Sequence, residues 1–144
     1  MFADLADSTA LSQHLDPEDL SDVTRAYQAT VKAAVEAFDG YIARYMRDGV
    51  LVYFGYPVAH EDDPERAVRA ALELCRDVVR LPTHAPLAAR VGIATGEVVV
   101  GELIGEGASR ESAVVGETPN LAARLQSIAV TSQKVRALAA PQRG

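Results

Sequence analysis

Apolar residues recur at steps of three and four along two long stretches of the chain, which predicts two amphipathic helices. The first begins after Asp16, a residue suited to N-capping, has Pro17 at its first position, and ends before Gly40. The second begins within residues 62–64, where Asp62 or Asp63 precedes a proline. The residues expected to face the core are Leu20, Val23, Tyr27, Val31, Ala34, Val35 and Phe38 in the first helix, and Ala67, Val68, Ala71, Leu72, Cys75, Val78 and Val79 in the second.

Short runs rich in β-branched and aromatic residues predict strands around these helices. Residues 2–5 are short, apolar and abrupt, as expected for the end of a strand whose beginning is absent. Residues 43–55 place an Asp-Gly pair between two apolar runs, which predicts an antiparallel hairpin. Residues 87–105 predict a second hairpin that turns at residues 95–97.

A third helix is predicted with Thr118 as its N-cap, Pro119 at its first position, and Leu121, Leu125 and Ile128 facing inward. The order is then strand, helix, strand, strand, helix, strand, strand, helix. This order is typical of an α+β fold, a ferredoxin-like (palm-type) sandwich of helices on a mostly antiparallel sheet. The missing strand residues suggest that this sheet is truncated at both ends.

The composition fits one globular domain with a core, since 49% of the 144 residues are hydrophobic and 24% are charged. We expect this domain at residues 1–129 and an unstructured or atypical tail at residues 130–144. The single cysteine, Cys75, excludes an internal disulfide and suits a reducing compartment. Neither a bilayer-spanning run nor a signal sequence is present, so we expect a cytoplasmic location without membrane insertion. A net charge of −6 argues against a nucleic-acid partner, and a polyanionic ligand would need local help such as a metal ion.

Four stretches in the same order resemble the class III adenylate/guanylate cyclase catalytic domain, in its bacterial branch. They are "FADLADSTALSQHLDPEDL", "RYMRDGVLVYFGYPVAHEDDPERAVRAAL", "RVGIATGEVVVGELIGEG" and "VVGETPNLAARLQ". Together they extend from residue 2 to about residue 128. The resemblance implies conversion of a nucleoside triphosphate to a 3′,5′-cyclic nucleotide and diphosphate in intracellular signalling.

The resemblance implies two divalent cations, Mg²⁺ or Mn²⁺, held by Asp4, Asp48 and the backbone carbonyl of Leu5. One ion would acidify the ribose 3′-hydroxyl and the other would hold the triphosphate and its leaving group. Taken singly, each aspartate could instead be a strand-end or turn residue. The loop that the resemblance assigns to phosphate binding consists of Ala6, Asp7, Ser8 and Thr9.

The resemblance also implies that Asn120 orients the ribose and that Arg124 stabilises charge on the reacting phosphate. Their spacing of four residues places both on one face of a helix. Arg44 and Ala113 match the two base-reading positions, and Ala113 has no polar side chain. Arg44 can donate to an adenine ring nitrogen but lacks the acceptor that would read guanine, which favours ATP over GTP.

The chain departs from the family pattern at the expected site, because Arg47 and Asp7 stand where glycines are usual. Lys134 does not match the family's triphosphate-binding lysine. The resemblance implies a head-to-tail homodimer with two shared sites. The alternative is a catalytically degenerate domain that binds nucleotide or only dimerises. A diguanylate cyclase is disfavoured because no Gly-Gly-acid-acid-Phe sequence occurs at the hairpin.

Overall fold

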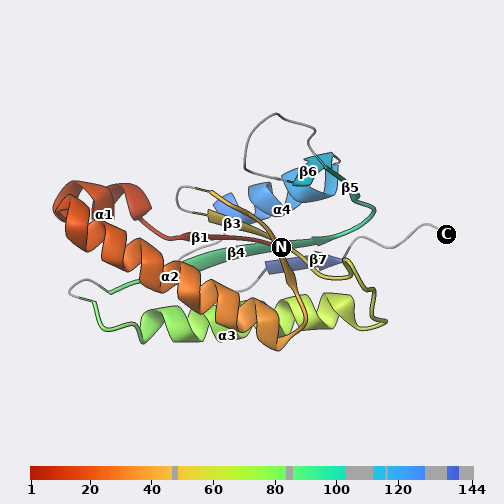
Figure 1. Cartoon of the computed structure of the whole chain (residues 1–144), viewed down its shortest axis with the longest axis horizontal. Helices are drawn as coiled ribbons and strands as arrows, with labels where there is room; N and C mark the ends of the chain where they lie inside the picture. The colour runs from red at the N-terminus through yellow and green to blue at the C-terminus, as the bar shows by residue number, and fades with distance from the viewer. Residues whose placement is uncertain (47–48, 84–85, 103–111, 116, 129–135, 140–144) are drawn as a thin grey trace.

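The computed structural model describes residues 1–46, 49–83, 86–102, 112–115, 117–128 and 136–139. This part of the chain contains helices and strands in mixed order (Figure 1). They are β1 (Phe2–Leu5), α1 (Ser8–His14), α2 (Pro17–Ala37), β2 (Tyr41–Tyr45), β3 (Gly49–Tyr53), α3 (Asp63–Val79), β4 (Ala89–Thr95), β5 (Val99–Glu102), β6 (Ser112–Val115), α4 (Glu117–Ser127) and β7 (Arg136–Ala139). None of the described helices is long and apolar enough to cross a bilayer.

The main sheet has five strands in the order β2-β3-β1-β4-β7. Its first four strands pair antiparallel, and β7 pairs parallel with β4. The central strand β1 therefore lies between β3 and β4, as expected when two strand-helix-strand units interleave. Helices α2 and α3 lie on one face of the sheet and α4 lies on the other (Figure 1). The predicted ferredoxin-like sandwich of helices on a mostly antiparallel sheet is confirmed.

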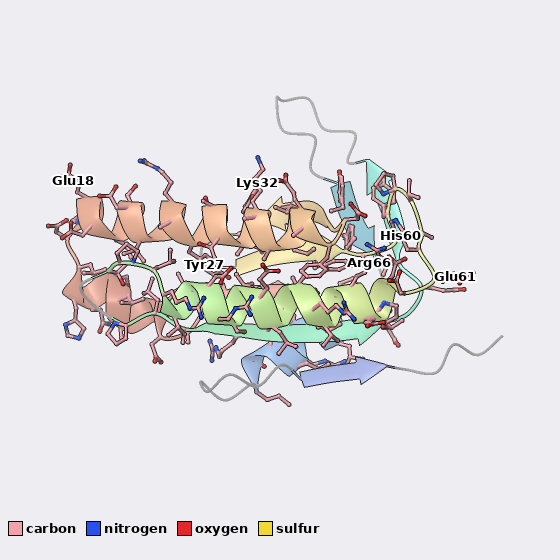
Figure 2. All side chains as sticks on the ribbon, turned by 90° about the horizontal axis from the view of Figure 1, so that it is seen from below. Glu18, Tyr27, Lys32, His60, Glu61 and Arg66 are labelled. Carbon is pink, nitrogen blue, oxygen red and sulfur yellow. The ribbon has the colours of Figure 1, made fainter. Side chains whose placement is uncertain are left out.

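Alternate residues of the central strands face the α2–α3 pair and form the core. Tyr27, which is 1% exposed, lies between the two helices, whereas Glu18 and Lys32 point away from α3 (Figure 2). The core residues contributed by the sheet are Ala3, Leu5, Val50, Val52, Val91 and Ile93. The residues that alternate with them along the strands, including Asp4 and Arg90, belong to the opposite face of the sheet, which we call the α4 face.

The start of α2 agrees with the prediction. Asp16 accepts a hydrogen bond from the backbone N–H of Asp19 at 2.9 Å, and Pro17 occupies the first turn. This cap satisfies one of the N–H groups that a helix start leaves without a partner. Of the predicted stripe, Leu20 and Phe38 are half-buried and the other members are buried.

The predicted inward face of α3 is partly wrong. Leu72 and Val79 are 50% and 52% exposed, and Val68 is half-buried, whereas Leu74 is fully buried. Both leucines fit an apolar period near 3.6, so the sequence does not decide between them. The helix packs through small residues that allow close approach to the sheet, and its buried residues are Ala67, Ala70, Ala71, Leu74, Cys75 and Val78.

The predicted hairpin at residues 95–97 is also wrong. β4 and β5 do not pair, because β4 pairs with β1 and β7 while β5 pairs with β6. The chain leaves the sheet after Thr95, and the hydroxyl of Thr118 donates to the backbone carbonyl of Glu97 at 3.1 Å. Thr118 lies one residue inside α4, since the described helix begins at Glu117, instead of preceding it as the expected N-cap.

The expectation of an unstructured or atypical tail from residue 130 is corrected by β7. Its four residues, Arg136–Ala139, form the edge of the main sheet beside β4. A strand of four residues has too few alternations to stand out from its surroundings in the sequence. The other residues after 128 lie outside the described part of the chain.

Cys75 is buried as predicted, and its Sγ–H lies 3.8 Å from the carbonyl oxygen of Ala89. Burial raises the pKa of this thiol and lowers its thiolate fraction at neutral pH. We expect a thiol-reactive disulfide reagent to modify the folded chain at pH 7.5 roughly 100-fold more slowly than the chain in urea. Free cysteine in the same urea concentration provides the control, and native and unfolded rates within threefold of each other would contradict the prediction.

Candidate functional site

Asp4 and Arg90 form a two-point ion pair across neighbouring strands on the α4 face. They are register partners in the β1–β4 ladder, and the guanidinium Nε and Nη2 lie 3.2 and 3.3 Å from Oδ1 and Oδ2 of Asp4. The side chain of Asp4 is 13% exposed and that of Arg90 is 29% exposed. A carboxylate that is mostly buried needs such compensation. Sequence analysis did not identify Arg90. Only its position as a charged residue directly before the buried part of a strand could have drawn attention to it.

The predicted hairpin between β2 and β3 is confirmed, but Gly49, which was expected in its turn, belongs to β3. The backbone N–H of Met46 donates to the carbonyl of Gly49 at 2.8 Å, which joins the strands on either side of Arg47 and Asp48. Both of these residues lie outside the described part of the chain. Gly49 begins β3 and is the register partner of Asp4, so Asp48 directly precedes in sequence the residue that lies opposite Asp4.

Gly49 does not adopt a left-handed conformation, and its missing side chain instead allows close approach to β1. A Cβ at this position would lie 3.2 Å from the carbonyl oxygen of Ala3 and 3.3 Å from the ring of Phe2. The Asp-Gly pattern predicts the hairpin correctly, but the glycine allows close packing of strands where a positive φ in the turn was expected.

The predicted phosphate loop is shorter than expected. Ser8 and Thr9 form the first turn of α1, so only Ala6 and Asp7 connect β1 to that helix. Ala6 is buried and its N–H donates to the carbonyl of Ala88 at 2.8 Å. Sequence analysis missed α1 because a helix of seven residues shows little periodicity.

Asp7 adopts a left-handed conformation with φ 55° and ψ 30°, and its side chain makes no capping hydrogen bond. This conformation disfavours side chains other than those of asparagine and aspartate. The backbone thus accounts for the glycine that the resemblance places here. The carboxylate of Asp7 is exposed three residues after Asp4.

A β-bulge decides the direction of Arg44. Ile42 pairs with Val52 and packs against the core, but the register shifts before Arg44, which pairs with Leu51 of the α4 face. Without this shift Arg44 would share the face of Ile42, because it lies two residues further along the strand. The next residue, Tyr45, lies on the α2 side, where desolvation and then the Glu36 carboxylate raise its pKa. The bulge therefore brings Arg44 to the same face of the sheet as Asp4.

Asn120 and Arg124 lie on the solvent side of α4, and both are exposed. The opposite side of this helix packs on the sheet, where the backbone at Ala122 and Gln126 is in close contact with Gly92. The two predicted catalytic side chains therefore share one helix face, as expected, but that face is turned away from Asp4 of the same chain. A site that contains Asp4 together with Asn120 and Arg124 would therefore have to take the last two residues from another copy of the chain.

Other predicted residues of this region differ from expectation. Ile128 is 59% exposed instead of facing inward, whereas Gln126 is buried. Leu121 is half-buried, and Leu125 is buried as predicted. Ala113 pairs with Gly101 in the β5–β6 hairpin, which is separate from the sheet that carries Arg44.

Comparison with known proteins gives a consistent result. Residues 1–137 match the family described as the adenylate and guanylate cyclase catalytic domain. The chain is 31% identical over 134 residues to adenylate cyclase 1 of Rhizobium meliloti (strain 1021), covering 89% of this chain and 20% of that protein. It is 34% identical over 128 residues to an adenylate cyclase of Streptomyces coelicolor (strain ATCC BAA-471 / A3(2) / M145), covering 89% of this chain and 29% of that protein.

A solved structure extends this likeness to the fold. The crystal structure of the guanylyl cyclase Cya2 superimposes with a TM-score of 0.77 at 34% sequence identity, covering 90% of this chain and 68% of that one. The chain thus spans less than a third of the two curated relatives and about two thirds of the solved domain.

Proposed function

Since this chain belongs to the adenylate and guanylate cyclase catalytic domain family, we propose that it converts a nucleoside triphosphate, preferably ATP, to a 3′,5′-cyclic nucleotide and diphosphate. The observation that carries this proposal is the convergence on the α4 face. Asp4 presents a mostly buried carboxylate there, Gly49 opposite Asp4 directly follows Asp48, and the bulge turns Arg44 to the same face.

The residues around Asp4 fit a cation site. Its carboxylate already requires a positive partner, which Arg90 supplies in this structure. Carboxylate and carbonyl oxygens are the donors preferred by Mg²⁺ and Mn²⁺, and we propose that Asp4, Asp48 and the carbonyl of Leu5 hold two such ions. When bound, the ions supply acidification of the ribose 3′-hydroxyl and compensation of the charge on the departing diphosphate.

The remaining work falls to side chains that bind and orient the nucleotide. Arg44 donates hydrogen bonds to the purine, and a guanidinium without an acceptor suits adenine better than guanine. Asn120 holds the ribose so that its 3′-oxygen faces the α-phosphate. Arg124 donates to the phosphate oxygens on which charge increases in the transition state.

We further propose that two copies of the chain share these roles in a head-to-tail homodimer. Asn120 and Arg124 face solvent on the side of α4 opposite the sheet, so one chain does not bring them to its own Asp4. A partner related by a two-fold axis would supply Asn120 and Arg124 to each Asp4, which gives two equivalent sites.

A second candidate function is nucleotide binding or dimerisation without catalysis. It is favoured by Asp7, whose exposed carboxylate lies in the loop that would face the phosphates, and by Arg47 and Ala113 at positions where the family has other residues. A like charge about 5 Å from a phosphate would oppose nucleotide binding unless a metal ion compensates it.

The test is cyclic nucleotide production by the purified chain from ATP and from GTP, with Mn²⁺, with Mg²⁺ and with excess chelator. We expect product from ATP at a higher kcat/KM than from GTP, and no product with chelator. A folded, dimeric chain that forms no cyclic nucleotide with either metal would overturn catalysis and leave the binding function.

The charge at Asp7 provides a graded test of the phosphate loop. Because the carboxylate is exposed and screened, we expect Asp7→Asn to improve nucleotide affinity by about tenfold. Asp7→Gly should match this gain and also stabilise the fold by roughly 0.5–1 kcal/mol, since glycine adopts the left-handed conformation without strain. Fluorescent-nucleotide titration and urea unfolding measure the two effects. Unchanged or weaker affinity in both variants would show that Asp7 does not face the phosphates.

A further inference from the structure

We infer that Arg90 is a competing cation at Asp4, so that the site binds a divalent metal ion weakly until the guanidinium is drawn away. This inference rests on the proposed function, because it concerns the carboxylate assigned there to metal binding. It adds a condition for metal entry that the proposed reaction does not itself contain. Arg90 would act through Asp4 and is therefore a positioning residue.

The contact geometry supports this competition. Two guanidinium nitrogens lie at 3.2 and 3.3 Å from the two different oxygens of Asp4, so neither oxygen is left without a positive neighbour. The pair is fixed by backbone register, since Asp4 and Arg90 are directly opposite one another in the β1–β4 ladder. A planar fork aligned with a carboxylate is a strong and specific arrangement.

The surroundings make the pair difficult to displace by a metal ion alone. With Asp4 13% exposed and Arg90 29% exposed, solvent and salt screen their attraction only in part. A divalent ion at Asp4 would also lie within a few ångströms of the guanidinium, and the like charges would repel. A polyanion such as a triphosphate gives the guanidinium another partner, so metal and polyanion should bind with positive coupling.

The experiment is a Mn²⁺ titration of the full chain without nucleotide, followed by the electron paramagnetic resonance signal of free Mn²⁺. We expect Arg90→Gln to bind Mn²⁺ about tenfold more tightly than the parent chain. The matched control is Arg69→Gln, which removes an exposed arginine paired with Glu65 on α3 and should leave Mn²⁺ affinity unchanged. Adding Asp4→Asn to Arg90→Gln should abolish the gain.

Arg90→Lys is a second variant in case Arg90→Gln misfolds, because lysine keeps the positive charge but lacks the planar guanidinium that contacts both oxygens of Asp4. Its Mn²⁺ affinity should lie between those of the parent and Arg90→Gln, and circular dichroism checks the fold of each variant. The inference would be overturned if both folded Arg90 variants bound Mn²⁺ no more tightly than the parent chain, or if the gain persisted without Asp4. It would also be overturned if no variant bound Mn²⁺ measurably. Since no nucleotide is present, a chain without cyclase activity can still show the gain, and an active chain can fail to show it.

Discussion

A mixture of the Asp48→Ala and Arg124→Ala chains is expected to recover about a quarter of the parent cyclase activity, although each variant alone is nearly inactive. Loss of Asp48 removes a proposed metal ligand, and loss of Arg124 should lower kcat by roughly 10²–10³-fold. In a head-to-tail dimer, half of the mixed dimers pair one chain of each kind. Each such dimer has one site with both defects and one intact site, which gives the quarter.

The recovery depends on Arg124 acting in the site of the other chain, which is the geometry suggested by its solvent-side position on α4. Arg76→Ala is the matched control, because Arg76 is an arginine on α3 with 58% of its side chain exposed, and this variant should keep parent activity. The assay follows cyclic AMP from ATP with Mn²⁺ at several mixing ratios. A mixture no more active than the variants alone, while each remains dimeric, would show that sites are not shared.

Gly92→Ala is expected to destabilise the fold by about 3 kcal/mol or more. A Cβ at this position would collide with the carbonyl oxygen of Ala122 and the backbone nitrogen of Gln126. These atoms belong to the helix backbone and cannot turn aside as a side chain can, so α4 would have to move away from β4. Such a movement would also expose Leu125, which is buried in the parent chain.

Gly49→Ala is the matched control for this prediction. Its Cβ would lie 3.2 Å from the nearest described atom outside its chain neighbours, a contact that a small shift relieves, so we expect a loss of about 1 kcal/mol or less. Urea unfolding followed by circular dichroism compares the two variants with the parent chain. A Gly92→Ala chain as stable as Gly49→Ala would mean that α4 is not held against β4 as described.

The sequence predicted those parts of the fold that are determined by neighbours along the chain. The cap at Asp16, the long apolar period of α2 and the paired runs of the β2–β3 hairpin are local signals, and each is confirmed. The sequence did not predict which strands pair, since pairing depends on residues far apart in the chain. The β5 run looks equally suited to β4 and to β6, and β7 has only four residues.

In the candidate site, too, the sequence predicted local features but not contacts between distant residues. Motif order identified Asp4 and Arg44, and the structure brings both to one sheet face. The ion pair between Asp4 and Arg90 joins residues 86 positions apart, so no local pattern could reveal it. The shared face of Asn120 and Arg124 followed from helical spacing, whereas the direction of that face followed only from the packing at Gly92.

The bulge between Ile42 and Arg44 has a consequence for how base preference could evolve in this chain. The register shift, and not the side chain alone, selects which residue of β2 reaches the α4 face. Deleting Ala43 would remove the extra residue and leave Arg44 opposite Leu51 on that face. Straightening the strand with Ala43 kept would instead place Ala43 opposite Leu51 and turn Arg44 to the side of Ile42. Loss of the codon for Ala43 would therefore keep the proposed base-contacting cation in place, whereas a substitution that only straightens the strand would remove the cation from that face although Arg44 itself is inherited unaltered.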